Sequence, residues 1–241
     1  MSKLLARFAV PSLAIVIFAG CLLRSNVAAS EKVTTLPKPA VDETLASSPG
    51  HEVAVISGGC FWGIQLVFQH VKGVISATSG YSGGSSSTAE YEIVSTGTTN
   101  HAESVKVVFD PSQITYGQLL QVFFSVAHDP TQLNRQGPDE GTQYRSVIFY
   151  SNDEQKRIAQ AYIAQLDQAK VFSHKIVTQV VRLTAFYPAE HYHQNFATLH
   201  PDNPYIARFD LPKLAALQQV FPQLYRSSTE GATLASGAAK N

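Results

Sequence analysis

Cys60 is the residue of this chain whose setting best suits chemistry. It follows Gly58-Gly59, which end an apolar, β-branched run over residues 53–56, and it precedes an amphipathic segment over residues 64–71. This order predicts a thiol at the N-terminus of a helix. Unpaired backbone N–H groups stabilise a thiolate there, so we expect the pKa of Cys60 to be lowered. The alternative is that Cys60 is a small buried hydrophobic residue of the core.

Glu103 is a second candidate, because it lies in a predicted strand and shares a face with apolar side chains. Residues 101–109 alternate so that Glu103 projects with Val105, Val107 and Phe109. Burial disfavours the charged carboxylate, so we expect a raised pKa and a proton donor that works near neutral pH. Two alternatives remain open: a bend that leaves Glu103 in solvent, or an ion pair with a structural arginine.

Four aromatic residues could complete such a site. Tyr91 follows a glycine- and serine-rich loop at residues 80–88, which we expect to be mobile, and Tyr144 ends a long polar loop. Each phenol can donate a hydrogen bond from an apolar body, although either tyrosine could simply pack at the surface. Phe61 and Trp62 could wall an apolar subsite or belong to the core.

The histidines allow a different interpretation, since a Cys–His pair would make a nucleophilic hydrolase. The candidates are His101, His128 and His193, with Asp129 available to orient an imidazole, but the spacing selects none of them. The cluster at residues 190–193 lacks the HExxH pattern of a helical zinc site, so no metal is expected.

The composition favours one medium-sized globular domain. Of the 241 residues 44% are hydrophobic, and 18 Lys+Arg balance 18 Asp+Glu. Such a balanced charge gives no basic surface for nucleic acid, so nucleic-acid binding is not expected. We expect the protein to be a monomer.

The N-terminus has the order of an export signal. Two basic residues precede an apolar run over residues 8–23 and the small residues 27–29. Three outcomes are open: cleavage after the small residues, which we favour, lipid attachment at Cys21, which is second, or an uncleaved anchor. Each implies export, to the periplasm or to a membrane-attached position. With Cys21 removed or lipidated, Cys60 would be the free thiol of the mature protein, which indicates reactivity.

The chain divides into four parts. Residues 1–29 would be the signal or anchor, residues 30–50 a flexible linker, residues 51–226 the catalytic domain and residues 227–241 a disordered tail. Strands and helices alternate through the domain, which predicts an α/β (α+β) fold with a mixed sheet covered by helices. The expected strands span 53–56, 74–79, 101–109, 145–150 and 176–183, and the expected helices span 64–71, 115–126, 151–170 and 211–221.

Capping patterns mark the starts of three of these helices. Capping boxes begin at Thr115 and at Ser151, where a Gln or Glu follows three residues later. Asp210 stands two residues before a proline, which is typical of an N-cap.

The candidate residues belong to an ordered set of motifs that resembles the class A peptide methionine sulfoxide reductases. The segment Gly58-Gly-Cys-Phe-Trp-Gly63 looks like the signature of that family, and further family-like segments follow in the family's order. The set covers roughly residues 51–225 and is far more specific than a single Cys-Phe-Trp. The further segments are Gly80-Tyr-Ser-Gly-Gly84, Gly97-Thr-Thr-Asn-His-Ala-Glu103, Phe109-Asp-Pro111, His128-Asp-Pro130, Arg135-Gln-Gly137, Asp139, Gly141-Thr-Gln-Tyr-Arg-Ser146 and Tyr192-His-Gln194.

The resemblance implies a fold and a reaction. The fold would be a compact two-layer structure with a ferredoxin-like core in a mixed sheet, flanked by helices, long loops and coil. The reaction would be reduction of the S epimer of methionine sulfoxide, free or in oxidised proteins. No bound cofactor is implied, and the electrons would come from an external thiol, either a thioredoxin-like protein or a small thiol.

The resemblance also implies roles for residues. Cys60 would attack the sulfoxide sulfur, and Glu103, hydrogen-bonded with Tyr91 and Tyr144, would protonate the oxygen. Cys60 would then be left as a sulfenic acid. The residues implied in substrate binding are Phe61 and Trp62, which would hold the methyl group, and Asp139, which would orient the substrate.

The chain departs from the family pattern in two places. Gln65 stands where many members have Glu, but we expect activity to persist because the implied proton donor is Glu103. Residues 204–213 hold none of the resolving cysteines that many members carry there, so a thiol from outside the chain is expected to reduce the sulfenic acid. The alternatives to this function are a Cys–His acyl hydrolase and an exported redox sensor.

Overall fold

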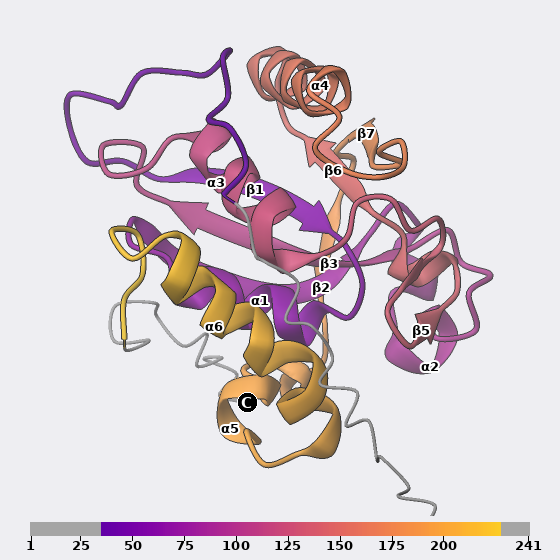
Figure 1. The fold of residues 1–241 in the computed structure, drawn as a ribbon. Coiled ribbons are helices and arrows are strands. Elements are labelled where there is room, and N and C mark those ends of the chain that lie inside the picture. Colours follow the sequence, from indigo (N-terminus) through magenta and orange to yellow (C-terminus); the bar gives the residue numbers. More distant parts are fainter. Residues whose placement is uncertain (1–34, 228–241) are drawn as a thin grey trace, which may run out of the picture. The chain divides into compact units, whose positions relative to one another are not determined.

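A six-stranded mixed sheet forms the centre of the computed structural model, which describes residues 35–227 (Figure 1). The strand order is β7-β6-β1-β3-β2-β8, and every neighbouring pair is antiparallel except β6 with β7. A short ribbon of β4 and β5 lies outside this sheet. The strands are β1 Glu52–Ser57, β2 Val74–Ser82, β3 Ala102–Phe109, β4 Arg135–Gln136, β5 Asp139–Glu140, β6 Val147–Tyr150, β7 Gln179–Arg182 and β8 Phe186–Pro188.

Six α-helices accompany the strands in the described part of the chain. Helix α1 lies against β2 and β3, α6 lies beside α1, and α4 lies beside β6 and β7 (Figure 1). The helices are α1 Phe61–Gln69, α2 Tyr91–Val94, α3 Tyr116–Val122, α4 Asp153–Gln168, α5 Phe196–Leu199 and α6 Leu211–Val220.

The order β1-α1-β2-β3-α3-β6 builds the ferredoxin-like core that the resemblance implies. Its four strands stand in the order β6-β1-β3-β2 with antiparallel neighbours, which is the split βαβ arrangement. The fold class expected from the sequence, a mixed sheet flanked by helices, is therefore confirmed.

One face of the sheet carries the main apolar core. Alternate residues of β3, among them Val105 and Val107, pack there with side chains of α1, α3 and α4. A smaller cluster around Val55 and Phe149 lies on the opposite face. Because side chains of a strand alternate between faces, Glu103 shares the main-core face with Val105, as expected.

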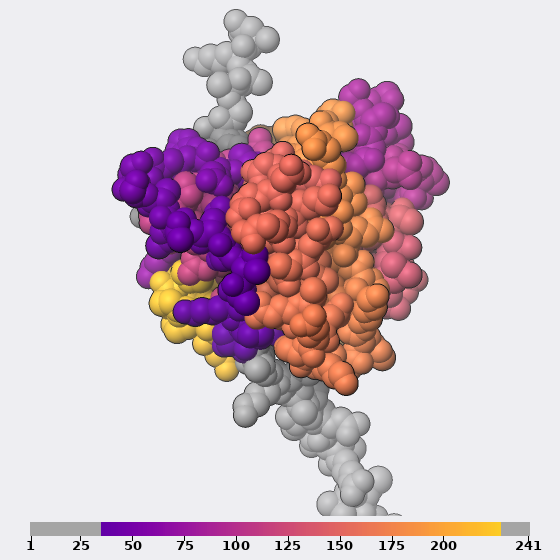
Figure 2. Space-filling model, turned by 90° about the horizontal axis from the view of Figure 1, so that it is seen from above, coloured from indigo at the N-terminus to yellow at the C-terminus, as the bar shows by residue number. Residues whose placement is uncertain are grey.

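The described part of the predicted linker, residues 35–50, contacts the domain. Leu36 is buried in the main core, and the Tyr162 hydroxyl donates to the Pro37 carbonyl at 2.8 Å. Asp42 accepts a hydrogen bond from the Gly117 N–H at the start of α3. Figure 2 shows the indigo N-terminal segment lying along the salmon-coloured α4. Three prolines in residues 35–50 suggested a spacer, and in the structure single side chains connect this segment to the rest of the domain.

Several predictions concern residues outside the described range. These are the export signal and anchor at 1–29, the first part of the linker at 30–34 and the tail from residue 228 onward. Within residues 35–227, no helix is long and apolar enough to cross a membrane.

Element boundaries differ from the expected ones where local capping or pairing decides. Helix α1 begins at Phe61, three residues earlier than expected, and β2 continues to Ser82 because residues of the predicted mobile loop pair with β3. Helix α3 ends at Val122 and continues as a π-helical turn. The N-cap of α4 is Asn152, whose side chain accepts from the Gln155 N–H, so Ser151 is not the cap.

Two predicted caps are found where the sequence placed them. Thr115 and Gln118 form both hydrogen bonds of a capping box at the start of α3. Asp210 is the N-cap of α6, with Pro212 in the first turn, although its side chain makes no capping hydrogen bond.

Candidate active site

The turn before α1 presents Cys60 at the N-cap of the helix, as predicted. Gly59 makes this turn possible, because its φ of +95° is a conformation that other L residues rarely adopt. A Cβ at Gly59 would also lie 2.5 Å from the side chain of Gln136. The Gly59 N–H donates to the Tyr144 carbonyl at 3.1 Å, which ties the turn to a second loop.

The expected lowering of the Cys60 pKa is wrong. Cys60 is only 8% exposed, and burial raises the pKa of its thiol well above the usual 9.0, with Glu103 and Asp210 adding to the effect. The Trp62 N–H and Lys213 oppose this rise, but the sulfur makes no hydrogen bond that caps the helix. The helix terminus is present as predicted, and desolvation outweighs it. The resting sulfur is therefore a thiol, and a thiolate has to form when substrate is bound.

Glu103 faces the nucleophile from β3. Its side chain is 3% exposed, and its Oε2 accepts a hydrogen bond of 3.0 Å from the Phe61 N–H. Burial raises the pKa of Glu103 from 4.5 to about 8, with Asp139 adding to the rise and the Phe61 N–H opposing it. The carboxyl group therefore holds its proton at neutral pH, as the strand pattern predicted.

A cavity of about 190 Å³ joins these two groups to the aromatic residues singled out in the sequence. A thiol and a protonated carboxyl group in one small cavity can attack an electrophilic atom and supply the proton that its leaving oxygen requires. The lining residues are Cys60, Phe61, Trp62, Tyr91, Glu103, Asp139, Tyr144 and Tyr205.

Tyr91 and Tyr144 are held in place from their backbones. The Tyr91 N–H donates to Glu190 at 2.8 Å, and the same carboxylate accepts from the Tyr81 hydroxyl at 2.8 Å. Arg145 fixes the other loop through the carbonyls of Asn100, His101 and Thr142. Burial raises the pKa of both phenols, with Glu103 as the next cause, so each keeps its proton. The hydrogen bond that the structure gives Glu103 is to the Phe61 N–H rather than to either tyrosine.

Tyr205 is a member of the cavity that the sequence analysis missed. Its hydroxyl donates a hydrogen bond to Asp139, which links the C-terminal segment to the loop of β5. Burial and this contact raise the pKa of Tyr205, so the phenol remains a donor. Nothing local marks Tyr205 in the sequence, since it lies in the segment that appeared only as a departure from the family pattern.

Trp62 packs against the aromatic rings of Phe196 and His193. Its indole stacks on Phe196 with ring centroids 4.0 Å apart, and its Nε1 donates to His193 Nδ1 at 3.2 Å. The His193 ring in turn packs 5.0 Å from Phe61 and 4.4 Å from Tyr91. These contacts fix the apolar wall of the cavity.

Comparisons with known proteins agree with this geometry. Residues 52–224 match the family described as peptide methionine sulfoxide reductase. The chain belongs to this family. A peptide methionine sulfoxide reductase MsrA 2 of Mesorhizobium japonicum is 63% identical over 179 residues, which is 74% of this chain and 92% of that protein. A protein of the same name from Synechocystis is 52% identical over 77% of this chain and 88% of that protein.

Solved structures of the family resemble the fold as well. Methionine sulfoxide reductase A of Corynebacterium diphtheriae is 37% identical, with a TM-score of 0.55 over 70% of this chain and 84% of its own. Reduced Mxr1 of Saccharomyces cerevisiae is 30% identical, with a TM-score of 0.58 over 68% of this chain and 92% of its own. The chain is accordingly a peptide methionine sulfoxide reductase by family, an oxidoreductase that acts on sulfur groups.

The histidines do not supply a base to the nucleophile of this reductase. His128 is buried between Phe123 and Ser146, and burial lowers its pKa to about 4. His101 contacts Gly84 and the Ser85 carbonyl, and His193 supports Trp62. None of the three lines the cavity of Cys60, and the Cys–His hydrolase is not supported.

Gln65 lies in α1, where many relatives were expected to have Glu, and it serves the scaffold of the reductase. Its amide NH2 donates to the Ala77 carbonyl at 2.9 Å and to Gln194 at 3.1 Å. Its carbonyl accepts from the Asn195 N–H at 2.8 Å. Gln65 thus joins α1 to β2 and to the segment that carries Phe196, and it does not line the cavity.

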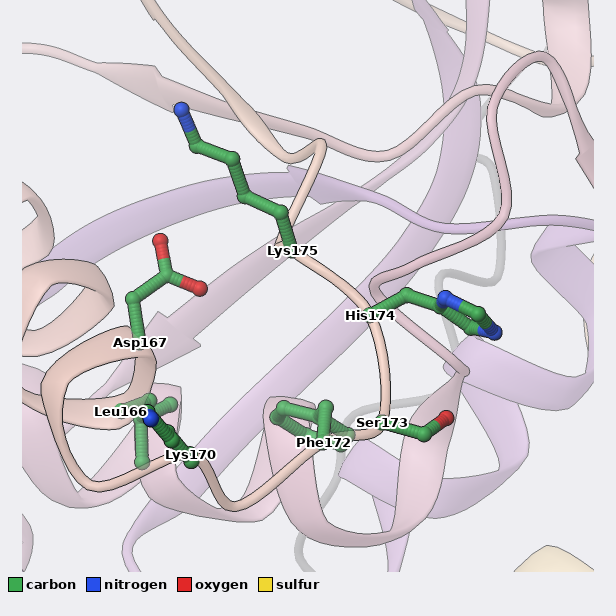
Figure 3. Close-up of a pocket in the computed structure, with 7 residues that line it drawn as sticks. All are labelled: Leu166, Asp167, Lys170, Phe172, Ser173, His174 and Lys175. Carbon is green, nitrogen blue, oxygen red and sulfur yellow. The ribbon is translucent and has the colours of Figure 1, made fainter.

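A larger cavity of about 440 Å³ lies at the end of α4, away from this chemistry (Figure 3). Asp167 and Lys175 line it, but His174 and Lys175 point in different directions, so the polar groups do not converge on one point (Figure 3). None of the predicted site residues borders it. The reductase site is the smaller cavity at Cys60.

Proposed function

We propose that the chain reduces the S epimer of methionine sulfoxide, free or in oxidised proteins, at the cavity that Cys60 and Glu103 share. The observation that carries this proposal is the hydrogen bond of 3.0 Å that the residue after Cys60, Phe61, donates from its backbone N–H to Glu103, while Cys60 and Glu103 line the same cavity. A nucleophile and an acid that line one small cavity can act on one S–O bond.

In the proposed reaction the Cys60 thiol releases its proton to water, and the thiolate attacks the sulfoxide sulfur while the sulfoxide oxygen is protonated. Glu103 supplies the proton, because its pKa of about 8 keeps the carboxyl group protonated at neutral pH. Methionine leaves, the oxygen remains on Cys60 as a sulfenic acid, and the two electrons that reduce the substrate come from Cys60. Tyr91 and Tyr144 stabilise the developing charge on the oxygen by donating hydrogen bonds.

The substrate methyl group is proposed to lie against Phe61 and Trp62, the apolar wall of the cavity. Asp139, held by Tyr205, is proposed to orient the polar part of the substrate. No cofactor is required, since the cysteine itself is the electron donor.

A thiol from outside the chain is proposed to return Cys60 to its starting state. No cysteine follows Cys60 in the sequence, and Cys60 is the free cysteine of the described residues. A first thiol condenses with the sulfenic acid to form a mixed disulfide and water, and a second thiol releases Cys60. A thioredoxin-like protein or a small thiol would serve.

An exported location is proposed from the sequence of residues 1–29, with removal of the signal favoured and lipid attachment at Cys21 second. Mass spectrometry of the protein purified from cells would decide between these. A chain that begins near Ser30 supports cleavage, a lipid mass on Cys21 supports the lipoprotein, and an intact Met1 in the cytoplasm contradicts export.

Separate incubation with the two epimers of dabsyl-methionine sulfoxide and dithiothreitol tests the reaction. The S epimer should be converted to dabsyl-methionine and the R epimer should persist. The Cys60→Ser variant should convert neither epimer. Reduction of the R epimer alone, or turnover that survives Cys60→Ser, would refute the proposal.

A further inference from the structure

A buried ion pair lies beside the first turn of α1, outside the cavity described above. Asp210, the N-cap of α6, is 0% exposed, and its Oδ1 accepts from Lys213 Nζ at 3.0 Å. The Lys213 side chain is 19% exposed. Asp210 Oδ2 has no hydrogen-bond partner among the described residues, although it too is buried. Burying such a pair is costly, so a role beyond stability has to be considered.

The pair occupies the space that a side chain at position 63 would fill. A Cβ on Gly63 would lie 2.1 Å from Asp210 Oδ1 and 2.7 Å from Lys213 Nζ. Gly63 is the third residue of α1, and Cys60 is the N-cap of the same helix. Cys60 and the Asp210–Lys213 pair therefore border the same turn of the same helix.

The charged and titratable groups around Cys60 make Lys213 distinctive. Asp210 and Glu103 raise the pKa of the thiol, whereas Lys213 lowers it, and the same ammonium group acts on Asp139. Lys213 thus places a positive charge among these carboxyl groups. The groups that face Cys60 from the surrounding elements are Glu103 of β3, Asp139 of β5, Tyr91, Tyr144, Tyr205, Asp210 and Lys213 of α6.

We propose that Lys213, held by Asp210 against the first turn of α1, is a positioning residue that stabilises negative charge on the Cys60 sulfur. The inference rests on the proposed function, in which Cys60 must carry that charge twice. It does so first as the attacking thiolate, and again when the mixed disulfide is reduced. Asp210 fixes the ammonium group in place and moderates its effect, so that the sulfur remains protonated between turnovers.

The second of these steps shows why a cation is needed. A reducing thiolate attacks the outer sulfur of the mixed disulfide, a new S–S bond forms to that sulfur, and the bond to Cys60 breaks. Cys60 leaves with the electron pair as a thiolate and takes a proton from water afterwards. A buried thiolate is a poor leaving group unless a positive charge is near, because a thiol of high pKa leaves slowly.

Three variants separate this role from a merely structural one. Lys213→Gln removes the cation, Asp210→Asn removes the carboxylate, and Lys213→Arg keeps the positive charge. Lys175→Gln is the matched control, since Lys175 is an exposed lysine at the other cavity. The readout is the rate at which iodoacetamide alkylates Cys60 at pH 8, because the thiolate is the form that reacts.

We expect Lys213→Gln to slow alkylation at least about threefold and Asp210→Asn to accelerate it by a similar factor, since opposite charges act on one sulfur. Lys213→Arg and Lys175→Gln should stay close to the unmodified protein. Release of Cys60 from its mixed disulfide with glutathione should slow in Lys213→Gln as well. Circular dichroism confirms that each variant is folded.

The double variant Asp210→Asn, Lys213→Gln provides a second measurement in case a single variant does not fold. Removing both charges of a buried pair is better tolerated than removing one. Its alkylation rate should lie between those of the two single variants. Equal rates in Lys213→Gln and Lys175→Gln, or shifts of the two single variants in the same direction, would overturn the proposal. Alkylation needs no sulfoxide, so this result is independent of whether the epimer assay succeeds.

Discussion

The Phe61 N–H and the Glu103 carboxyl group are joined by a hydrogen bond of 3.0 Å between α1 and β3. Phe61 is the residue that follows the nucleophile, so this bond sets the position of the acid relative to Cys60. Because both groups are buried, the bond forms in a medium where it is stronger than in water. The distance between nucleophile and acid is thus fixed by the backbone of the fold.

Replacing the acid should slow chemistry while leaving this bond in place. In Glu103→Gln the side-chain oxygen still accepts from Phe61, but no proton is available, so methionine formation should fall by about 10²–10⁴-fold at pH 7 and by less at pH 5. The unmodified enzyme should lose rate as the pH rises through about 8, the pKa of Glu103. Single-turnover assays across this range check both expectations. Glu92→Gln, an exposed residue, is the control, and an unchanged rate in Glu103→Gln at pH 7 would refute the assignment.

The same substitution should affect stability with a defined sign. The pKa of Glu103 is about 8 in the folded chain, against an ordinary value of 4.5. Between these two pH values the folded state therefore binds one proton more than the unfolded state. Stability of the unmodified protein should therefore fall as the pH rises from about 4.5 to about 8, by up to about 1.4 kcal/mol per pH unit. Glu103→Gln has no carboxyl group at this position, so its free energy of unfolding should not fall in this way. Urea unfolding at pH 5, 7 and 9 should show that the stability of the variant relative to the unmodified protein increases with pH. A constant difference between the two proteins would contradict the raised pKa.

Gln65 should not tolerate a carboxylate in its place without cost. In Gln65→Glu an oxygen would face the Ala77 carbonyl and the Gln194 oxygen, both of which now accept from the Gln65 amide. We expect a loss of roughly 1–3 kcal/mol at pH 8, and a smaller loss at pH 5, where a protonated carboxyl group can donate once. Urea unfolding at both pH values measures this, with exposed Gln223→Glu as the control. Equal stability at pH 8 would show that the network rearranges.

Tyr205 should act through Asp139. Tyr205→Phe removes the hydrogen bond that links the C-terminal segment to the loop of β5, so kcat/KM should fall about tenfold, mainly through a higher KM. Steady-state kinetics with the S epimer test this, and Tyr150→Phe, which lies outside the cavity, is the control. A fall confined to kcat would instead place Tyr205 in the chemical step.

Local patterns were sufficient to predict the two central residues. The glycine break before an amphipathic segment placed Cys60 at a helix start, and the alternation of β3 placed Glu103 on the buried face. Both are properties of a few neighbouring residues, which is why the sequence alone can show them. Local position also singled out the four aromatic residues. The ordered motifs gave them roles and added Asp139, and all five line the cavity.

Features that depend on distant contacts could not be predicted. The direction of the Cys60 pKa shift depends on how deeply the fold buries the sulfur, and no helix-start pattern records that burial. Tyr205 reaches the cavity only because η5, Ile206–Asp210, and α6 pack against α1. The anchoring of residues 35–50 rests on individual contacts: Leu36 is buried in the main core, and its carbonyl accepts a hydrogen bond from Gln121 of α3.

Oxidation of Cys60 in one turnover tests the central claim most directly. The protein is mixed with excess methionine S-sulfoxide and dimedone, with no thiol present, and both methionine and the modified peptide are quantified. The account predicts about one methionine per chain and a dimedone adduct on Cys60, because each sulfur can supply one pair of electrons. Methionine formed without an adduct on Cys60, or formed equally by Cys60→Ser, would contradict it.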